Sequence, residues 1–128
     1  MQVSNISILF VAISLALLSP AVGCSEKNDS PSGIVIKLYN ACNEGRYSEV
    51  KKMMPANIIE AVEKNGGIKY MCDINTRRGT VARVEITNEQ IRGEGANVTA
   101  TIHFTDGTRK TRDVTSLVKD GGSWKLSP

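Results

Sequence analysis

The chain has 128 residues, among them 16 Lys or Arg and 13 Asp or Glu, so its formal net charge is +3. That length is enough for one domain and too short for two. The basic residues do not form the stripe with interleaved aromatic side chains that is typical of nucleic-acid binding, so we expect no nucleic-acid partner. The densest basic stretch, TRKTR at residues 108–112, is interrupted by threonine and is typical of a solvated strand edge.

The chain begins with an apolar leader. Residues 1–23 contain no charged side chain, and the run ISILFVAISLALL at residues 6–18 is almost wholly apolar. As a helix this run would span roughly 20 Å, which is less than the ~30 Å hydrocarbon core of a bilayer. The length predicts a signal peptide over residues 1–23 rather than a transmembrane helix, although no Lys or Arg precedes the apolar run.

Cys24 follows the leader in the sequence AVGC. The motif resembles the bacterial lipobox, in which cleavage makes the cysteine the first mature residue and lipid, including palmitate-type acyl chains, is attached to its sulfur and amino group. The alternatives are cleavage by signal peptidase I after the small residues Ala21 and Gly23, and an ordinary thiol at Cys24. The lipobox interpretation gives a signal peptide (1–23), a lipidated cysteine with a flexible tether (24–30) and one folded domain (31–128).

Two further cysteines, Cys42 and Cys72, remain once Cys24 is lipidated. An exported compartment permits a disulfide between them. Closing a loop of about 30 residues would stabilise the fold by roughly 3 kcal/mol. The alternative is two separate buried thiols, because Cys42 lies on the apolar face of a predicted helix and spacing alone does not fix the distance between the β-carbons.

Three helices are predicted between residues 31 and 67. The first has Ser30 as N-cap and Pro31 at its first helical position, and it ends at Gly45. A short second helix covers residues 46–54, and a third covers residues 55–67. Residues 68–80 predict a short strand or a loop that packs on the core. The apolar stripe of the first helix comprises Ile34, Val35, Leu38, Ala41 and Cys42.

After residue 80 the apolar period changes to two, which predicts strands at residues 81–87, 97–105, 109–119 and 123–127. In the first strand Ala82, Val84 and Ile86 are expected on the buried face. Residues 88–97 predict a turn or a bulged connection. Asp106-Gly107 predicts a tight hairpin. Helices followed by an antiparallel meander predict an α+β fold, with N-terminal helices packed on a curved antiparallel sheet of about four strands. The clearest inward pattern is that of Val98, Ala100, Ile102 and Phe104.

Three segments carry a resemblance to a known superfamily: SGIVIKLYNACNEGRYSEVKKMM (32–54), NVTATIHFTDGT (97–108) and SLVKDGGSWKLS (116–127). The mature chain resembles the nuclear-transport-factor-2-like superfamily, with its cystatin-like cone, and more narrowly its small bacterial lipoproteins of unknown function. The resemblance implies a strongly bent sheet around the first helix, with a pocket at the open end. Enzymes of the superfamily use an Asp base and a Tyr donor inside the cone, but no motif assigns these roles to residues of this chain.

The candidates for chemistry are few. His103 lies on the polar face of its strand, where it is either an exposed strand histidine or a catalytic group with Asp113 as its nearest partner. Tyr39, Tyr70 and Asp113 are candidate pocket-lining residues. Tyr39 is alternatively a helix-boundary tyrosine with a packed ring, and Trp124 is expected in the core. We expect no cofactor and no metal, because no His, Cys and Asp residues show ligand spacing.

The sequence therefore predicts a lipid-anchored accessory protein of the bacterial envelope, whose domain binds a small ligand or an envelope protein without catalysis. The alternatives are a small isomerase or hydrolase of the same superfamily, and a secreted, non-acylated binding domain. A homodimer through the open sheet face is a further expectation. Ser25 after the cysteine, in place of Asp, favours the outer membrane, facing the periplasm.

Overall fold

The computed structural model describes residues 29–128. The predicted signal peptide and Cys24, with the first part of the predicted tether, lie outside the described residues. The elements of the fold, in chain order, are α1 (Pro31–Asn43), α2 (Tyr47–Lys52), α3 (Ala56–Lys64), α4 (Gly67–Thr76), β1 (Val81–Arg92), β2 (Gly95–Phe104), β3 (Arg109–Asp120) and β4 (Ser123–Leu126).

Helix α1 begins as its sequence predicts. The Ser30 side chain accepts a hydrogen bond from the Gly33 amide at 3.0 Å, and Pro31 occupies the first turn, where its missing N–H costs nothing. The chain leaves the helix through Gly45, whose φ of 76° is accessible to glycine at little cost. The predicted stripe is the buried face of α1, with Val35 and Ala41 fully buried.

The prediction of a strand or loop at residues 68–80 is wrong, because most of this segment forms α4. Ile68, Cys72 and Thr76 are its buried residues, and they follow one another at a spacing of four, as one face of a helix requires. The preceding pair Gly66 and Gly67, both at positive φ, ends α3 and starts α4 without an intervening loop. The domain therefore has one helix more than the three predicted.

The four strands form an antiparallel meander in the order β1-β2-β3-β4. The prediction for residues 88–97 is corrected: β1 continues to Arg92, and only Gly93 and Glu94 form the turn. A register shift between Val81 and Arg83 leaves Ala82 exposed rather than inward, while Val84 and Ile86 pack against the core. The inward pattern predicted for β2 is confirmed, because its four alternating apolar residues are all buried: Val98, Ala100, Ile102 and Phe104.

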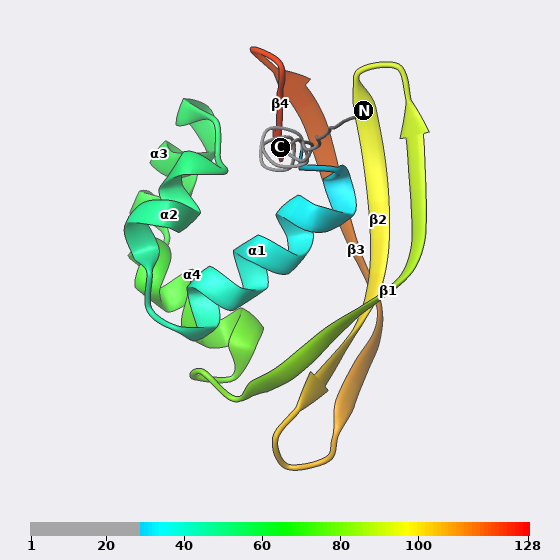
Figure 1. Ribbon diagram of the computed structural model, residues 1–128. Coiled ribbons are helices and arrows are strands. Elements are labelled where there is room, and N and C mark those ends of the chain that lie inside the picture. The colour runs from blue at the N-terminus through cyan, green and yellow to red at the C-terminus, as the bar shows by residue number, and fades with distance from the viewer. Residues whose placement is uncertain (1–28) are drawn as a thin grey trace, which may run out of the picture.

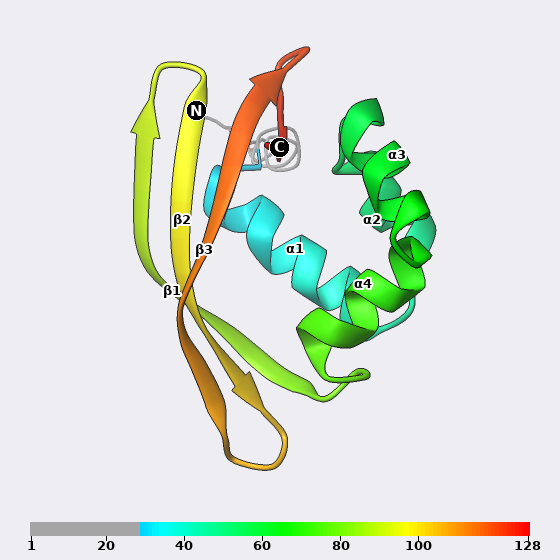
Figure 2. The ribbon, with the colours of Figure 1, turned by 180° about the vertical axis from the view of Figure 1, so that it is seen from behind.

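The sheet curves around α1, and α2, α3 and α4 lie on the side of α1 away from the sheet (Figure 1). The view from behind shows the same arrangement, with the long strands β2 and β3 bending together along the sheet (Figure 2). The core lies between the concave face of the sheet and the helices. This is the predicted α+β fold, with N-terminal helices on a curved antiparallel sheet.

Candidate functional site

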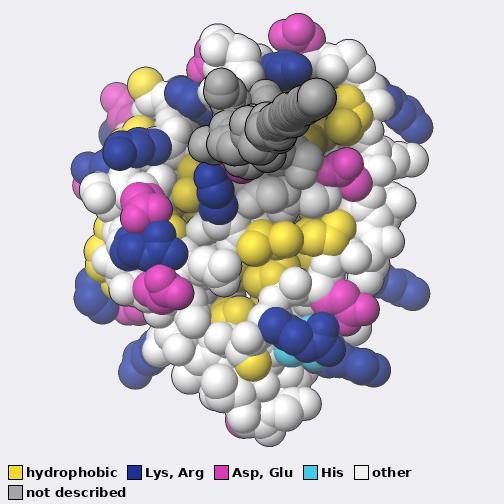
Figure 3. Space-filling view, in the orientation of Figure 1, with side chains coloured by type: hydrophobic (Ala, Val, Ile, Leu, Met, Phe, Trp, Pro, Cys, Tyr) yellow, Lys and Arg dark blue, Asp and Glu magenta, His cyan; other side chains and the backbone are white. Residues whose placement is uncertain are grey.

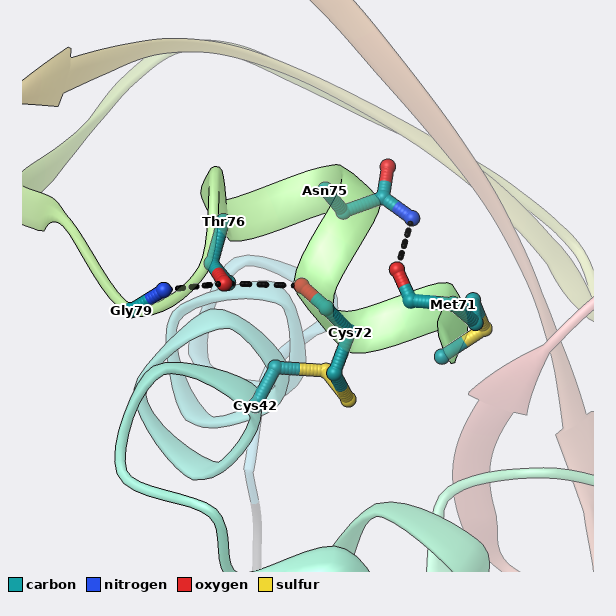
Figure 4. The surroundings of a disulfide bond; sticks show 6 residues. All are labelled: Cys42, Met71, Cys72, Asn75, Thr76 and Gly79. Atoms are coloured by element: carbon teal, nitrogen blue, oxygen red, sulfur yellow. Dashed lines mark hydrogen bonds between the residues drawn. A yellow bond between two sulfur atoms is a disulfide. The ribbon is translucent and has the colours of Figure 1, made fainter. Parts of the chain in front are cut away.

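The C-terminal end of α1 is tied to α4 by a disulfide between Cys42 and Cys72, whose Cα atoms lie 4.9 Å apart (Figure 4). Thr76, one turn after Cys72, is fully buried; its hydroxyl donates to the Cys72 carbonyl at 2.7 Å and accepts from the Gly79 amide at 3.0 Å. The arrangement fixes α4 against α1 and leaves neither sulfur as a free nucleophile.

Two of the predicted pocket-lining residues lie together. Tyr39 of α1 is buried, and its hydroxyl donates a hydrogen bond of 2.6 Å to Asp113 of β3. The other carboxylate oxygen of Asp113 forms a 2.8 Å ion pair with Lys110. Burial first, then the hydrogen bond and the negative charge of Asp113, raise the pKa of the Tyr39 phenol well above its usual range.

A bulge in β3 makes this cluster. Asp113 pairs with Ala100 and Lys110 with Ile102, so the two strands change register between these pairs. Arg112, in the bulge, has a φ of 56°, an unusual conformation for a residue other than glycine. Residues three apart in a regular strand point to opposite faces, but the extra residue here places Lys110 and Asp113 on the same side. Asp113 is thereby held by two partners.

His103 does not pair with Asp113. Its Nε2 lies 2.8 Å from Oε1 of Glu85 on the neighbouring strand, because His103 is opposite Arg83 and Arg109 in the sheet while Asp113 is further along β3. This hydrogen bond is the first cause of a lowered pKa of Glu85. Of the two alternatives for His103, the catalytic one with Asp113 as partner is therefore not supported, and the contact that exists is an exposed one across the β1–β2 ladder.

Tyr70 lies away from the Tyr39–Asp113 pair. It is 56% exposed on α4, where it borders an apolar groove of about 590 Å³ between α3, α4 and the C-terminal residues. Ile74, 57% exposed, lies on the same groove with Ile58 and Val62 of α3. Helix α3 has no fully buried residue, so its apolar stripe serves as a wall of this groove.

A larger and more polar cleft, of about 1120 Å³, lies between the N-terminal half of α1, α2 and the β3–β4 hairpin. We call it the lysine cleft. Its walls carry five basic side chains and two acidic ones, Asp29 and Glu49. That surplus of three positive charges equals the surplus of the whole chain. The basic residues are Lys37, Arg46, Lys52, Lys119 and Lys125.

Acidic residues in and around the lysine cleft pair with three of its five basic side chains. Lys37 pairs with Asp29 at 2.6 Å, and Arg46 pairs with Glu49 at 2.6 Å and with Glu44 at 2.9 Å. Lys125 lies at the limit of an ion pair, 4.0 Å from an Asp120 oxygen. Within residues 29–128, neither of the two other lysines, Lys52 and Lys119, forms a salt bridge.

Trp124 is buried in the core as predicted, with 8% of its surface exposed, and that exposed part borders the lysine cleft. The Lys119 ammonium lies 5.4 Å from the centre of its ring, within the range of a cation–π contact. In the space-filling view dark blue side chains lie on the left of the molecule, interspersed with magenta ones, and further dark blue side chains lie at the upper rim and on the lower right (Figure 3). The cleft combines a partly exposed aromatic ring with two lysines, Lys52 and Lys119, that form no salt bridge within residues 29–128.

Sequence reasoning did not find the lysine cleft, because its walls come from four separate parts of the chain and each contributes ordinary surface residues. Neither Tyr39 nor Asp113 is among its lining residues, so the predicted pocket-lining residues do not define it. Among residues 29–128, no group of three or more His, Cys, Asp and Glu side chains is placed to hold a metal ion. In the same residues no helix is long and apolar enough to cross a membrane.

The bent sheet around α1 gives the domain an α+β fold of the nuclear-transport-factor-2-like type. Residues 22–127 match the family described as "Domain of unknown function (DUF4878)", and the chain belongs to that family. A comparison with curated protein sequences finds no match.

Two solved structures are similar in fold. One is a protein from Campylobacter jejuni proposed to be an NTF2-like transpeptidase; the TM-score is 0.61 at 13% identity, and the match covers 76% of this chain and 96% of that one. The other is a SEC-C motif containing protein from Rhodopseudomonas palustris, with a TM-score of 0.50 at 13% identity, covering 78% of this chain and 77% of that one. At this identity the similarity shows the fold alone, and it confirms the expected nuclear-transport-factor-2-like fold.

Proposed function

We propose that this protein is a lipid-anchored accessory protein of the bacterial envelope, in which the NTF2-like domain binds a ligand or a partner protein and performs no reaction. The observation that carries the proposal is the position of the first structural element. The N-cap of α1 is Ser30, only six residues after the cysteine of the lipobox-like AVGC sequence. A complete domain thus begins almost directly after the proposed anchor.

The short tether has a geometric consequence. Six residues of fully extended chain reach at most about 21 Å, so the N-terminal end of α1 stays close to the surface that holds Cys24. The proposed division into leader, tether and domain fits the start of α1 at Pro31. Ser25, in place of Asp, favours anchoring in the outer membrane on its periplasmic side.

The lysine cleft is the binding site that the geometry supports best. It is larger than the apolar groove, it has charged and aromatic groups on its walls, and Asp29, Ser30 and Pro31 belong to its rim. Several charged and hydrogen-bonding side chains converge on this cleft beside the apolar surface of Trp124 and Ile91, a combination that suits a charged ligand. Both acidic side chains of the cleft are engaged in salt bridges, Asp29 with Lys37 and Glu49 with Arg46, and we propose that the cleft binds its ligand without reacting with it.

Replacing the proposed lipid attachment residue tests the anchor. A Cys24→Ala variant should accumulate with its leader uncut and without lipid label, whereas wild type should enter the membrane fraction as a shorter, labelled protein. Ser25→Ala, at the next position, is the control and should behave as wild type. Equal solubility and equal processing of the Cys24→Ala and wild-type proteins would contradict the anchor and favour a secreted, non-acylated domain.

A second candidate function is a small enzyme, and the Tyr39–Asp113 pair is the observation that favours it. A buried phenol beside a carboxylate on the inner side of the sheet is a combination suited to proton transfer. Both carboxylate oxygens of Asp113 are already engaged, however, because one accepts a hydrogen bond from Tyr39 and the other pairs with Lys110. The pair therefore has no oxygen directed at a substrate. A catalytic role predicts that Asp113→Asn abolishes a turnover that the Lys52→Gln variant retains.

A further inference from the structure

We propose that the lysine cleft binds the phosphate headgroup of an anionic phospholipid in the membrane that carries the anchor. This inference rests on the proposed function, because the anchor supplies the membrane. It adds a second contact between domain and bilayer, made by side chains rather than by the lipid on Cys24.

The first argument is the distribution of charge over the molecule. The described lining residues of the lysine cleft include five basic and two acidic side chains, and two further acidic residues outside the lining, Glu44 and Asp120, lie beside Arg46 and Lys125. Two of its lysines, Lys52 on α2 and Lys119 on β3, have no salt-bridge partner within the described residues. Cations gathered in a concave surface concentrate the field and attract an anion.

The second argument is the kind of anion that these groups suit. Lysine binds phosphate as a compact point charge with three rotatable donors, and it needs no fixed bidentate geometry. Ser48, Ser123 and Asn40 line the same cleft and offer neutral hydrogen-bond donors. The indole of Trp124 and the side chain of Ile91, 52% exposed, provide apolar surface beside these cations. A phosphodiester on a glycerol backbone offers a negative charge for the lysines, oxygen atoms for the neutral hydrogen-bond donors, and an apolar part for Trp124 and Ile91.

The third argument is location. Asp29, Ser30 and Pro31 are part of the cleft's rim, and the tether limits them to about 21 Å from Cys24. The anchor keeps the rim of the cleft near the headgroups of its own membrane, so their local concentration there is very high. A soluble anion gains nothing from the anchor. Basic residues at this distance gain from the negative surface potential of an anionic bilayer.

The test measures binding of the domain without its lipid. All the helices and strands that the structure describes, and the core between them, belong to residues 29–128, so a chain starting at Ser25 contains the whole described domain. This protein is mixed with sedimenting vesicles of phosphatidylcholine, with and without phosphatidylglycerol, at low salt. We expect binding only to the vesicles with phosphatidylglycerol, and its loss at high salt.

The variant that removes the site is Lys52→Gln with Lys119→Gln. Neutralising two lysines near an anionic surface should weaken vesicle binding on the order of 20-fold. The matched control is Lys51→Gln with Lys64→Gln, which removes the same charge from exposed positions outside the cleft. The control should bind essentially as wild type, and circular dichroism and thermal unfolding should show that both variants are folded.

Each outcome decides the inference. An equal loss in both double variants would show general charge attraction and overturn the cleft as the site. Tight binding of soluble glycerol phosphate that also displaces the protein from vesicles would assign the cleft to a free ligand and overturn the headgroup. Because the protein used has no lipid, absence of vesicle binding overturns this inference alone, while normal processing of the Cys24→Ala variant overturns the anchor.

Discussion

The two ends of helix α1 differ in how they are held. At the C-terminal end Cys42 is bonded to Cys72, and the Asn43 side chain makes two hydrogen bonds with the backbone of Val81, accepting from its amide at 2.9 Å and donating to its carbonyl at 3.2 Å. At the N-terminal end the helix borders a wide cleft with exposed lysines. The first end fixes helices and sheet to each other, and the second carries the lysine cleft, for which we propose a binding role. Changes at the two ends should therefore have different consequences.

Loss of the disulfide should have the largest effect on stability. A cross-link between residues separated by 30 positions stabilises by about 3.5 kcal/mol in the chain-entropy description. The Cys42→Ser, Cys72→Ser double variant should lose that amount in the free energy of unfolding, measured by urea denaturation. The measurement uses the chain from Ser25 onward, and the same chain with both cysteines is the control. A loss below about 1 kcal/mol would mean that the cross-link does not hold this end.

Asn43→Ala should have the next largest effect, about 2 kcal/mol, because the amide and carbonyl of Val81 lose their side-chain partner at the start of an edge strand. Asn40→Ala, one turn earlier and exposed in the lysine cleft, is the matched control. It should change the free energy of unfolding by less than about 0.5 kcal/mol. If both substitutions lowered the free energy of unfolding equally, the two ends of α1 would not differ in how firmly they are held.

Tyr39→Phe should destabilise the domain by about 1.5 kcal/mol, because it removes a buried hydrogen bond to a carboxylate while Lys110 still pairs with Asp113. Tyr70→Phe removes a hydroxyl from a tyrosine that is 56% exposed and should be neutral in the same urea titration. A neutral Tyr39→Phe would show that the contact between α1 and β3 contributes nothing to stability.

The same tyrosine predicts a dependence on alkaline pH. The pKa of Tyr39 is raised in the folded protein, so the folded state binds this proton more tightly than the unfolded state does. Its stabilising contribution is complete below the unfolded pKa of about 10 and is lost as the pH rises above it. The free energy of unfolding of wild type should fall more steeply above pH 10 than that of Tyr39→Phe. Parallel curves would contradict the assigned environment of the phenol.

The smallest effect on stability is expected in the lysine cleft. Lys52 and Lys119 have no salt-bridge partner among the described residues, so Lys52→Gln and Lys119→Gln should each change the free energy of unfolding by less than about 0.5 kcal/mol. Thermal unfolding of the single variants measures this. A marked loss of stability would mean that these lysines support the fold rather than a ligand.

The sequence predicts α1 and the meander because each carries a complete local signal: Ser30 and Pro31 at the helix start, alternating apolar residues in β2, and Asp106-Gly107 at a hairpin. Helix α4 is missed because its stripe has only three residues and follows two glycines, which usually mark a loop. Asp113 lies beside Tyr39 because a bulge in β3 changes which of its side chains face the core. No local sequence pattern predicts the position of that bulge.

The lysine cleft is beyond sequence reasoning for another reason. Its cations lie on α1, α2 and the β3–β4 hairpin, and each has the spacing of an ordinary solvated surface. Only the fold brings Lys52 and Lys119 to one concavity. The position of the proposed anchor, by contrast, follows from a short contiguous motif, AVGC, next to an apolar leader. A motif of adjacent residues can be recognised in the sequence, whereas a site built from distant segments can be recognised only in the folded structure.

The most direct test of the binding role is an NMR titration of the chain from Ser25 onward with short-chain phosphatidylglycerol. We predict that the largest shifts occur at the Trp124 indole N–H and at the amides of Lys52, Lys119 and Ser123, with the α4 amides around Cys72 unaffected. Shifts confined to the apolar groove at Ile58, Tyr70 and Ile74, or no shifts at all, would contradict the account.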